Sequence, residues 1–588
     1  MKAQSQQSSM HLLGRLFAYM GKNRKLVWLS VAVMVIGSFA LTFAPMKAGD
    51  VLDYLSACMS DGIPIDLSHV AMALVLIAGL YVAGHGFSIV SGRCMLKVSR
   101  DVTYNFRRSL HRKLHNLPIN YMDVHPHGDV TACLTNDMTA MESLVETDLA
   151  TLISNVIVLV FVLLMMVVIN PMLALVYLAL MPVAFLLTKA IAKRTRRNFK
   201  VQQETVGELN GYMGDVISNH SLVRSYNMEG LSKDSFSEIN MRSHRSYVKA
   251  RFLSGLINPL STIINNIGYI CTAVFGAYLI MQGDLTIGGF LAYLMYGQML
   301  SGPLISTATS LGQIQLGFSA MERLFDILDT EEEPDESGKG SIDPASIRGE
   351  VRFDDVVFGY TPDRTLFDGV SFTAEPGTVT AIVGPSGAGK TTVINLLMRF
   401  YEIQGGSITL DGMDTKDINR NDLRKAFGMV LQESWVFGGS VAENIGYGKE
   451  GATMDEIKAA ARAVGCESFI ETLPDGYDTR ISEENSGISV GEKQLLVLAR
   501  TVLSDPRILI LDEATSNMDT RTEALVTKAM EDMMEGKTTF IIAHRLFTIR
   551  NADKIIFMKG GSIREVGSHD ELMALDGEYA DMYRSMSS

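Results

Sequence analysis

Cysteine is scarce in this chain, with five in 588 residues. The five lie far apart, and no two have the spacing of a disulfide framework or of a metal-binding motif. We therefore expect reduced, mostly buried thiols and neither of those two structures. The positions are Cys58, Cys94, Cys133, Cys271 and Cys466.

Positive charge is also in deficit. The chain has 52 Lys and Arg against 65 Asp and Glu, a net charge of −13. Proteins that bind nucleic acid usually carry excess basic charge, so this balance argues against a nucleic-acid partner. The first residues, MKAQSQQSSMHLLGRLF, lack the apolar core and small-residue cleavage site of a signal peptide. Low-complexity segments and short-period repeats are absent as well.

Apolar residues, by contrast, make up 47% of the chain and gather into long uncharged runs in its first half. A helix needs about 20 residues to cross the hydrocarbon core of a bilayer. Residues 11–20, before the first run, predict a short amphipathic helix lying at the membrane interface. We predict six transmembrane helices, at residues 26–46, 68–92, 150–169, 172–188, 254–281 and 287–311.

Basic residues follow an alternating pattern around these spans. They are frequent at 22–25, 93–113 and 189–200, and few in the intervening loops. Because cytoplasmic loops are enriched in Lys and Arg, both termini are predicted to lie in the cytoplasm. The stretches 93–149 and 189–253 keep helical periodicity, so we expect the spans to continue as long helices on that side.

An acidic stretch rich in Pro, Gly and Ser, residues 330–346, predicts a linker. It divides a membrane domain, 1–329, from a second domain, 347–588. In the second domain short apolar strands alternate with helical patterns, which indicates a mostly parallel α/β sheet.

A phosphate-binding loop stands near the start of this second domain. The sequence GPSGAGKTT begins at Gly384, follows an apolar run at 379–383 and precedes a helical pattern at 393–398. Such a loop turns backbone N–H groups around phosphate oxygens, and the helix that follows adds its positive dipole end. Lys390 is predicted to contact the β- and γ-phosphates, and Thr391 to bind Mg²⁺. The predicted ATP-binding residues here are Gly384, Ser386, Gly387, Ala388, Gly389, Lys390, Thr391 and Thr392.

A buried-strand pattern at 508–511 ends in two acids. We predict that Asp512 holds Mg²⁺ and that Glu513 polarises the attacking water. Adjacent acids are often only surface charge, but a chain with a phosphate-binding loop favours the functional interpretation.

The sequence ISVGEKQ at 488–494 resembles the signature sequence of ATP-binding cassette (ABC) transporters, usually Leu-Ser-Gly-Gly-Gln. Ser489 and Gly491 match that signature, whereas Ile488, Val490 and Glu492 depart from it. The resemblance implies that Ser489 and Gly491 complete the ATP site of a partner domain. Glu492 would add negative charge there.

Further cassette elements match in order. Tyr360 resembles the aromatic residue that stacks on adenine, and Gln432 resembles the glutamine that senses Mg²⁺. His544 resembles the histidine that contacts the γ-phosphate, and residues 516–519 resemble the loop that crosses the dimer interface. In the first half, residues 115–137, 207–211 and 322–328 resemble the exporter-type branch of the family.

The resemblance implies a half-transporter, because one chain has six spans and one nucleotide domain. It would dimerise around two ATP molecules in the plasma or inner membrane of a bacterium. Residues 516–523 resemble the catalytically intact half of heterodimeric exporters, so a heterodimer is favoured over a homodimer. Expected cargo is an amphipathic or apolar small molecule, lipid or peptide. An ATP-driven importer on the same fold, for example of a metal chelate, is the alternative.

Two functional details stay open at this level. Polar residues inside the spans mark either a substrate pathway or helix-to-helix hydrogen bonds. They are Asn155, Asn258, Asn265, Asn266, Tyr269, Tyr293, Tyr296 and Gln298. The aromatic pair Trp435 and Phe437 predicts a socket for short cytoplasmic helices near 136–137 and 222–223.

Overall fold

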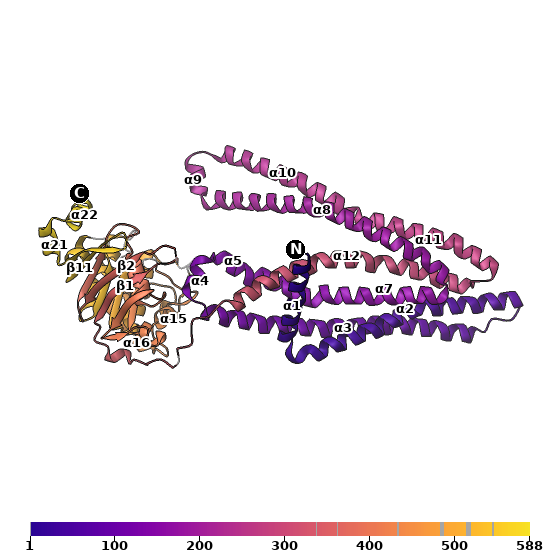
Figure 1. The fold of residues 1–588 in the computed structure, drawn as a ribbon, viewed down its shortest axis with the longest axis horizontal. Helices are drawn as coiled ribbons and strands as arrows, with labels where there is room; N and C mark the ends of the chain where they lie inside the picture. The colour runs from indigo at the N-terminus through magenta and orange to yellow at the C-terminus, as the bar shows by residue number, and fades with distance from the viewer. Residues whose placement is uncertain are drawn as a thin grey trace. The chain divides into compact units, whose positions relative to one another are not determined.

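The computed structural model describes residues 2–336, 338–361, 363–431, 434–482, 487–512, 519–543 and 546–587. The chain forms two compact units, coloured along the sequence in Figure 1. Unit 1 comprises Met1–Leu117 and His125–Glu331, and unit 2 comprises Pro118–Val124 and Glu332–Ser588.

The regular elements of unit 1 among its described residues are all helices, joined by short turns. Its long helices pack lengthwise: α2 lies along α3, α8 along α10, and α12 along both α2 and α7 (Figure 1). The elements are α1 (Lys2–Tyr19), η1 (Gly21–Asn23), α2 (Arg24–Asp61), α3 (Leu67–Asn116), α5 (His127–Ala132), η2 (Cys133–Asp137), α6 (Met138–Ser143), η3 (Leu144–Asp148), α7 (Leu149–Ile169), α8 (Pro171–Ser218), α9 (His220–Ser225), α10 (Glu229–Gly255), α11 (Ile257–Gln282) and α12 (Ile287–Asp329).

Four stretches among the described residues are long and apolar enough to cross a membrane: Gly21–Asp61, Leu67–Asn116, His127–Ile169 and Thr262–Gln282. They contain the predicted first, second and third spans and the part of the fifth from Thr262 onward. The predicted fourth and sixth spans lie in α8 and α12, continuous helices of 48 and 43 residues. The expected helical extensions are confirmed, since α3 alone runs for 50 residues.

Helix α1 packs on unit 1 through one apolar edge and one ion pair. Leu12, Leu16 and Met20 are buried along this edge. Both terminal nitrogens of Arg15 lie 2.6 Å from the carboxylate oxygens of Asp329, the last residue of α12. The N-terminal helix therefore holds the end of the helix that leads to unit 2.

Unit 2 contains two larger sheets. A six-stranded sheet has the order β12-β11-β3-β10-β9-β6, and a four-stranded antiparallel sheet has the order β2-β1-β4-β5. The strands are β1 (Val351–Phe358), β2 (Phe367–Ala374), β3 (Val379–Val383), β4 (Gly405–Leu410), β5 (Met413–Asp414), β6 (Phe427–Val430), β7 (Gly439–Ser440), β8 (Arg480–Ile481), β9 (Ile508–Asp512), β10 (Thr538–Ile542), β11 (Lys554–Lys559) and β12 (Ser562–Gly567).

The helices of unit 2 cover the sheets and bear the site. They are α4 (Ile119–Val124), η4 (Pro344–Ser346), α13 (Lys390–Leu397), α14 (Arg420–Lys425), α15 (Val441–Gly446), α16 (Met454–Val464), α17 (Glu467–Ile470), η5 (Gly476–Asp478), α18 (Val490–Ser504), α19 (Thr520–Met534), α20 (Leu546–Arg550), α21 (His569–Leu575) and α22 (Glu578–Ser587).

Both faces of the six-stranded sheet are buried. In β9, Ile508 and Ile510 join the core that holds α13 and β1, whereas Leu509 and Leu511 join the core that holds α16, α18 and α19. Side chains alternate along a strand, so a strand buried on both faces needs apolar residues at every position. This explains the apolar run before Asp512 and the mostly apolar run before the phosphate-binding loop, in which Thr380 is the one polar residue and is buried.

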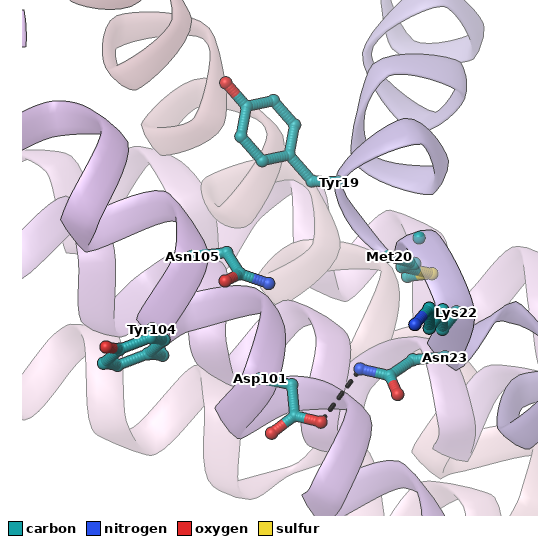
Figure 2. A pocket seen from close by; sticks show the side chains of 8 residues that line it. Tyr19, Met20, Lys22, Asn23, Asp101, Tyr104 and Asn105 are labelled. Carbon is teal, nitrogen blue, oxygen red and sulfur yellow. Dashed lines mark hydrogen bonds between the residues drawn. The ribbon is translucent and has the colours of Figure 1, made fainter.

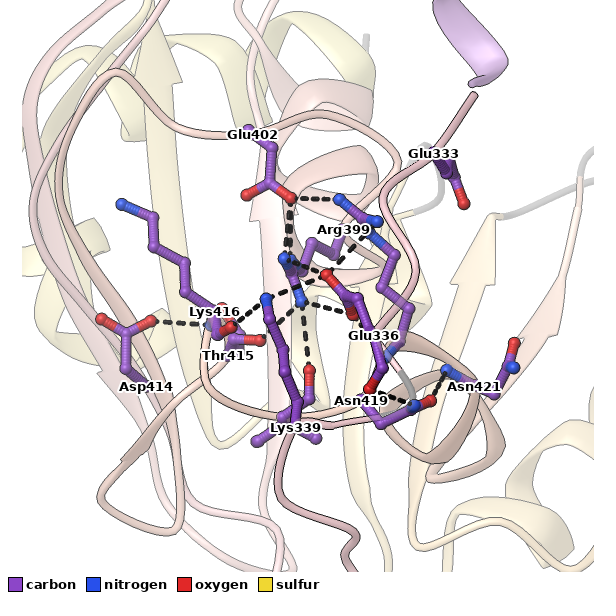
Figure 3. A network of polar contacts seen from close by, with 12 residues as sticks. Glu333, Glu336, Lys339, Arg399, Glu402, Asp414, Thr415, Lys416, Asn419 and Asn421 are labelled. Carbon is purple, nitrogen blue, oxygen red and sulfur yellow. Dashed lines mark hydrogen bonds and ion pairs between the residues drawn. The ribbon is translucent and has the colours of Figure 1, made fainter. Parts of the chain in front are cut away.

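The predicted linker is anchored within unit 2 through Glu336 (Figure 3). The Glu336 carboxylate lies 2.8 Å from Arg399, 2.9 Å from Lys339 and 3.3 Å from Arg420. Glu402 joins the same network at 2.9 Å from Arg399 and 2.5 Å from Arg420. Because Arg399 closely follows α13, the network ties the linker to the end of the phosphate-loop helix.

Candidate functional site

Four parallel strands bring the predicted site segments to one edge of the sheet. β3, β10, β9 and β6 run in the same direction as neighbours. Their carboxyl ends lead into the phosphate-binding loop, the 544–545 segment, the 513–518 segment and the 432–433 segment, respectively. Loops at this edge are where open α/β sheets bind ligands. Gln432, Glu513 and His544 themselves lie outside the described residues.

The loop glycines are required by close backbone packing. Gly389 has φ +104°, and a Cβ there would lie 2.5 Å from the ring of Phe367. A Cβ on Gly384 would lie 2.1 Å from the carbonyl oxygen of Met558. Only glycine fits both positions without displacing a neighbour, so the loop backbone is held in a curve at the start of α13.

Lys390 is the first residue of α13 and is only 8% exposed. Its ammonium donates to the carbonyl oxygens of Gly384, at 2.7 Å, and Pro385, at 3.2 Å. Burial lowers the pKa of Lys390, while the nearby carboxylate of Asp512 raises it, and the net shift is downward. Lys390 and Asp512 therefore lie close enough at the sheet edge for their charges to interact.

The two threonines of the loop have different surroundings. Thr391 is exposed, whereas Thr392 is buried and its hydroxyl lies 3.0 Å from the hydroxyl of Tyr360. Asn395 also donates to the Tyr360 hydroxyl, at 3.2 Å. Tyr360 remains 48% exposed, so its ring is tethered to α13 while much of its surface stays available for stacking.

Sequence reasoning missed a residue beside Tyr360. The ring of Tyr401 meets Tyr360 edge-to-face at 5.0 Å between centroids, and its hydroxyl donates to the carboxylate of Asp123 in α4. Burial is the main cause that raises the pKa of Tyr401, followed by its hydrogen bond to Asp123. No local signal reveals this contact, because the two residues are 278 positions apart.

The signature residues form the start of α18. Ser489 is its N-cap, and the hydroxyl of Ser489 accepts a hydrogen bond from the Glu492 N–H at 3.3 Å. The Glu492 carboxylate accepts one in return from the Ser489 N–H at 2.7 Å. Glu492 thus completes a capping box, a role that the Ser-x-x-Glu spacing could have predicted. Gly491 is buried in the first turn of α18.

The segment before α15 is held from two helices. Asn444 of α15 exchanges two hydrogen bonds of 3.1 Å with the backbone of Phe437. Arg500 of α18 donates to the Asn444 carbonyl at 2.9 Å and to the Trp435 carbonyl at 3.4 Å. The Trp435 side chain is nevertheless 55% exposed, so it does not fill the core of unit 2.

Asp137, in the segment 136–137 that is predicted to meet the socket, is paired within unit 1, and the socket itself stays a prediction. Asp137 is 9% exposed and accepts hydrogen bonds of 2.8 and 2.5 Å from Arg323 of α12. In this ion pair Asp137 is buried and Arg323 is exposed, and the contact helps to join η2 to α12 within unit 1. The short helix α4 groups with unit 2.

Two of the candidate pathway residues are structural. Tyr296 is fully buried, and its hydroxyl donates to the Thr42 carbonyl at 2.6 Å, which links α12 to α2. Tyr293 is also fully buried within unit 1. Tyr269, at 37% exposed, and Asn266 are the candidates that reach the surface of α11.

The residues present fit a nucleotide and a magnesium ion. Packing against Met558 and Phe367 leaves no room for a Cβ at Gly384 or Gly389, which fixes the path of a glycine-rich backbone of the kind whose N–H groups bind phosphate. Thr391 and Asp512 offer a hydroxyl and a carboxylate oxygen, the type of ligand that Mg²⁺ prefers. Two protein ligands are enough, because phosphate oxygens and water fill the remaining coordination positions. The described residues contain no cluster of three or more His, Cys, Asp or Glu for another metal.

Comparison with known proteins agrees with this geometry. The family "ABC transporter transmembrane region" matches residues 27–304, and the family "ABC transporter" matches residues 367–516. A "Fatty acid ABC transporter ATP-binding/permease protein" from Mycobacterium bovis is 40% identical over 521 residues, covering 89% of this chain and 82% of the relative. The chain belongs to the ABC transporters.

Other relatives define the type of transporter. An "ATP-dependent lipid A-core flippase" from Thiobacillus denitrificans is 32% identical over 98% of both chains. The solved structure of a bacterial Atm1-family ABC exporter with ATP bound has a TM-score of 0.78 at 30% identity, covering 97% of this chain and 99% of its own. The transporter is therefore a multi-pass half-transporter of the exporter type that hydrolyses ATP and dimerises. The importer alternative finds no support among these relatives.

Proposed function

We propose that the transporter exports an amphipathic lipid-like molecule with a large apolar part. The observation that carries this proposal is the absence of ionic side chains along α11 and the first 35 residues of α12, up to Met321. A strongly ionic substrate would find no counter-charge there. The names of two relatives, which refer to fatty acid and to lipid A-core, support the same class of substrate.

The nucleotide site would work through the residues at the sheet edge. Bound ATP with Mg²⁺ supplies the phosphoryl-transfer chemistry. The loop N–H groups from Ser386 to Gly389 bind phosphate oxygens, and Lys390 places its charge on the β- and γ-phosphates. Thr391, Asp512 and Gln432 hold the metal, Glu513 polarises water and His544 contacts the γ-phosphate.

The second half of each site is proposed to come from the partner chain. Ser489 and Gly491 stand at the start of α18, where the helix dipole favours an anion. We favour a heterodimer. Ile488, Val490 and Glu492 differ from the usual Leu-Ser-Gly-Gly-Gln signature, and a different partner chain could supply the usual signature to the ATP site of this chain. Purification of this chain alone with full ATPase activity would contradict that choice.

Orientation and location follow the charge pattern. The basic clusters at 22–25, 93–113 and 189–200 support a cytoplasmic position for both termini and the ATPase unit. Bacterial relatives support the inner membrane of a bacterium as its location.

The substrate proposal is tested with the purified dimer and with everted vesicles. Fatty acids and phospholipids should stimulate ATPase activity, and a radiolabelled amphiphile should accumulate in everted vesicles that are given ATP. Glu513→Gln vesicles are the matched control and should accumulate none. Stimulation only by hydrophilic peptides, or ATP-driven loss from everted vesicles, would overturn the proposal.

A further inference from the structure

A polar cavity lies where α1 meets α3 (Figure 2). Its volume is about 270 Å³, just below the range of about 300–1,000 Å³ that suits drug-sized ligands. It is therefore too small for a whole transported lipid and suits a small polar group. Tyr19, Met20, Gly21, Lys22 and Asn23 line it from the α1–η1 turn, and Asp101, Tyr104 and Asn105 from α3.

The lining offers one cation, one anion and several unused polar groups. Asn23 donates to one carboxylate oxygen of Asp101 at 2.9 Å. Among the described residues, no hydrogen bond or ion pair engages the second oxygen of Asp101, the Lys22 ammonium or the Tyr104 hydroxyl. Lys22 and Tyr104 are exposed, so the cavity opens to the surroundings of the protein.

The cavity lies at the depth of lipid headgroups. Trp28 is 70% exposed on α2, and exposed tryptophans are enriched at the membrane interface. Asn23 precedes Trp28 by five residues, about 7.5 Å along a helix. The headgroup layer is about 5–8 Å thick on each side of the hydrocarbon core. Asn23, and with it the Asp101 carboxylate to which it donates, therefore lies at the outer edge of that layer.

We propose that this cavity binds the headgroup of a zwitterionic aminophospholipid, with the phosphate on Lys22 and the primary ammonium on Asp101. Tyr104 and Asn105 provide further donors for the phosphate oxygens. The proposal rests on the proposed cytoplasmic placement of α1, and it is independent of the exported substrate.

Charge and hydrogen bonding select this headgroup. One lysine and one aspartate make the lining neutral, which matches a zwitterion better than an anion. A primary ammonium donates hydrogen bonds to the open oxygen of Asp101, whereas a choline group has no N–H to donate. Exposed Lys97 and Arg108 flank the cavity one turn away on α3 and would draw anionic lipids, so phosphatidylglycerol is a necessary competitor in the test.

A bound headgroup would stabilise the turn between α1 and η1. Met20 is buried at the turn, and Arg15 on the same helix pairs with Asp329 at the end of α12. A lipid held between η1 and α3 would fix the membrane depth of this turn, and with it the position of α1, whose Arg15 pairs with Asp329 of α12.

The test is native mass spectrometry of the purified dimer, titrated with phosphatidylethanolamine, phosphatidylcholine or phosphatidylglycerol that carry the same acyl chains. Wild-type protein should bind the first about tenfold more tightly than the second, the effect of one charge-assisted hydrogen bond. Asp101→Asn keeps an acceptor for Asn23 and should remove this preference. Lys22→Gln should weaken binding of all three lipids.

Matched controls are Asp234→Asn and Lys233→Gln, which remove exposed charges of the same kinds from α10. Both should bind like the wild type. The proposal is overturned if wild type binds phosphatidylethanolamine and phosphatidylcholine equally, or if phosphatidylglycerol binds most tightly and Asp101→Asn changes nothing. Unchanged binding of phosphatidylcholine by Asp101→Asn shows that the variant is folded. ATP-driven export is measured in a separate assay, so that failure of the proposed function can be told apart from failure of this proposal.

Discussion

Replacing Glu336 by alanine is expected to destabilise the ATPase unit strongly. The Glu336 side chain is 6% exposed and neutralises Arg399, whose side chain is 5% exposed, together with Arg420. Its carboxylate also accepts the backbone N–H of Arg420 at 3.0 Å. Alanine would leave two buried guanidinium groups with Glu402 as their only other carboxylate in the described network.

The magnitude follows from the burial of this network. Removing one partner of a buried ion pair costs about 3–5 kcal/mol, because the remaining charge stays desolvated. In the variant Arg399 still donates hydrogen bonds to the carbonyl oxygens of Thr415 and Ile418, both at 3.1 Å. We therefore expect a loss of stability at the lower end of this range. A loss of about 3 kcal/mol lowers the melting temperature of a domain of this size by about 6–12 °C.

The effect should depend on pH in a defined direction. Burial raises the pKa of Glu336, but its contacts with Lys339, Arg420 and Arg399 outweigh burial and the net pKa is lowered. A carboxylate with a lowered pKa stabilises the fold above its unfolded pKa, about 4.3, and loses that contribution as pH falls through the folded value. The difference between wild type and Glu336→Ala should be constant above pH 5 and shrink toward pH 3.

The assay is thermal unfolding of the full transporter in detergent, in which added ATP identifies the transition of the ATPase unit by shifting it upward. Glu336→Gln keeps one acceptor and should lie between alanine and wild type. Glu375→Gln, at an exposed acid of the same unit, is the control and should shift the transition by less than about 1 °C. A shift below about 2 °C for Glu336→Ala would refute the reasoning.

Three further predictions concern the catalytic cycle. Glu513→Gln should retain ATP binding and lose most turnover, because the group that polarises water is gone; near-normal hydrolysis in single-turnover assays would remove Glu513 from its role. Ser489→Ala should destabilise α18 by about 1 kcal/mol through loss of its cap. It should also impair nucleotide trapping at the phosphate loop of the partner; equal loss on both chains would count against a heterodimer. Trp435→Ala should leave basal ATPase activity and stability nearly unchanged, since the side chain is 55% exposed, but reduce transport. A proportional fall of both activities would show that Trp435 serves the ATPase itself.

Much of the fold was predictable because its signals are local. The spans are long apolar runs, and the phosphate-binding loop is nine consecutive residues between a strand and a helix, so neither depends on distant contacts. The capping role of Glu492 is equally local, since Ser489 and Glu492 have the Ser-x-x-Glu spacing of a capping box. A charge near the signature sequence does not by itself indicate this role.

The long-range pairings inside each unit were not predictable in this way. Asp137 meets Arg323 across 186 residues, and Asp123 meets Tyr401 across 278. Nothing in the composition around either residue of a pair identifies its partner, since any acid could pair with any base or hydroxyl.

By itself, the sequence determined the class of protein, the order of its two domains and the loop that binds phosphate, because hydrophobic period and glycine spacing act over a few residues. Only the tertiary structure decided which polar side chains are buried in contacts between helices and which stay exposed and able to bind a ligand or a partner. It buried Tyr293, Tyr296 and Asp137, and it left Trp435 and Lys22 exposed. The reason is that burial is a property of packing between elements distant in the chain, and the energetic role of a polar group depends on whether packing desolvates it.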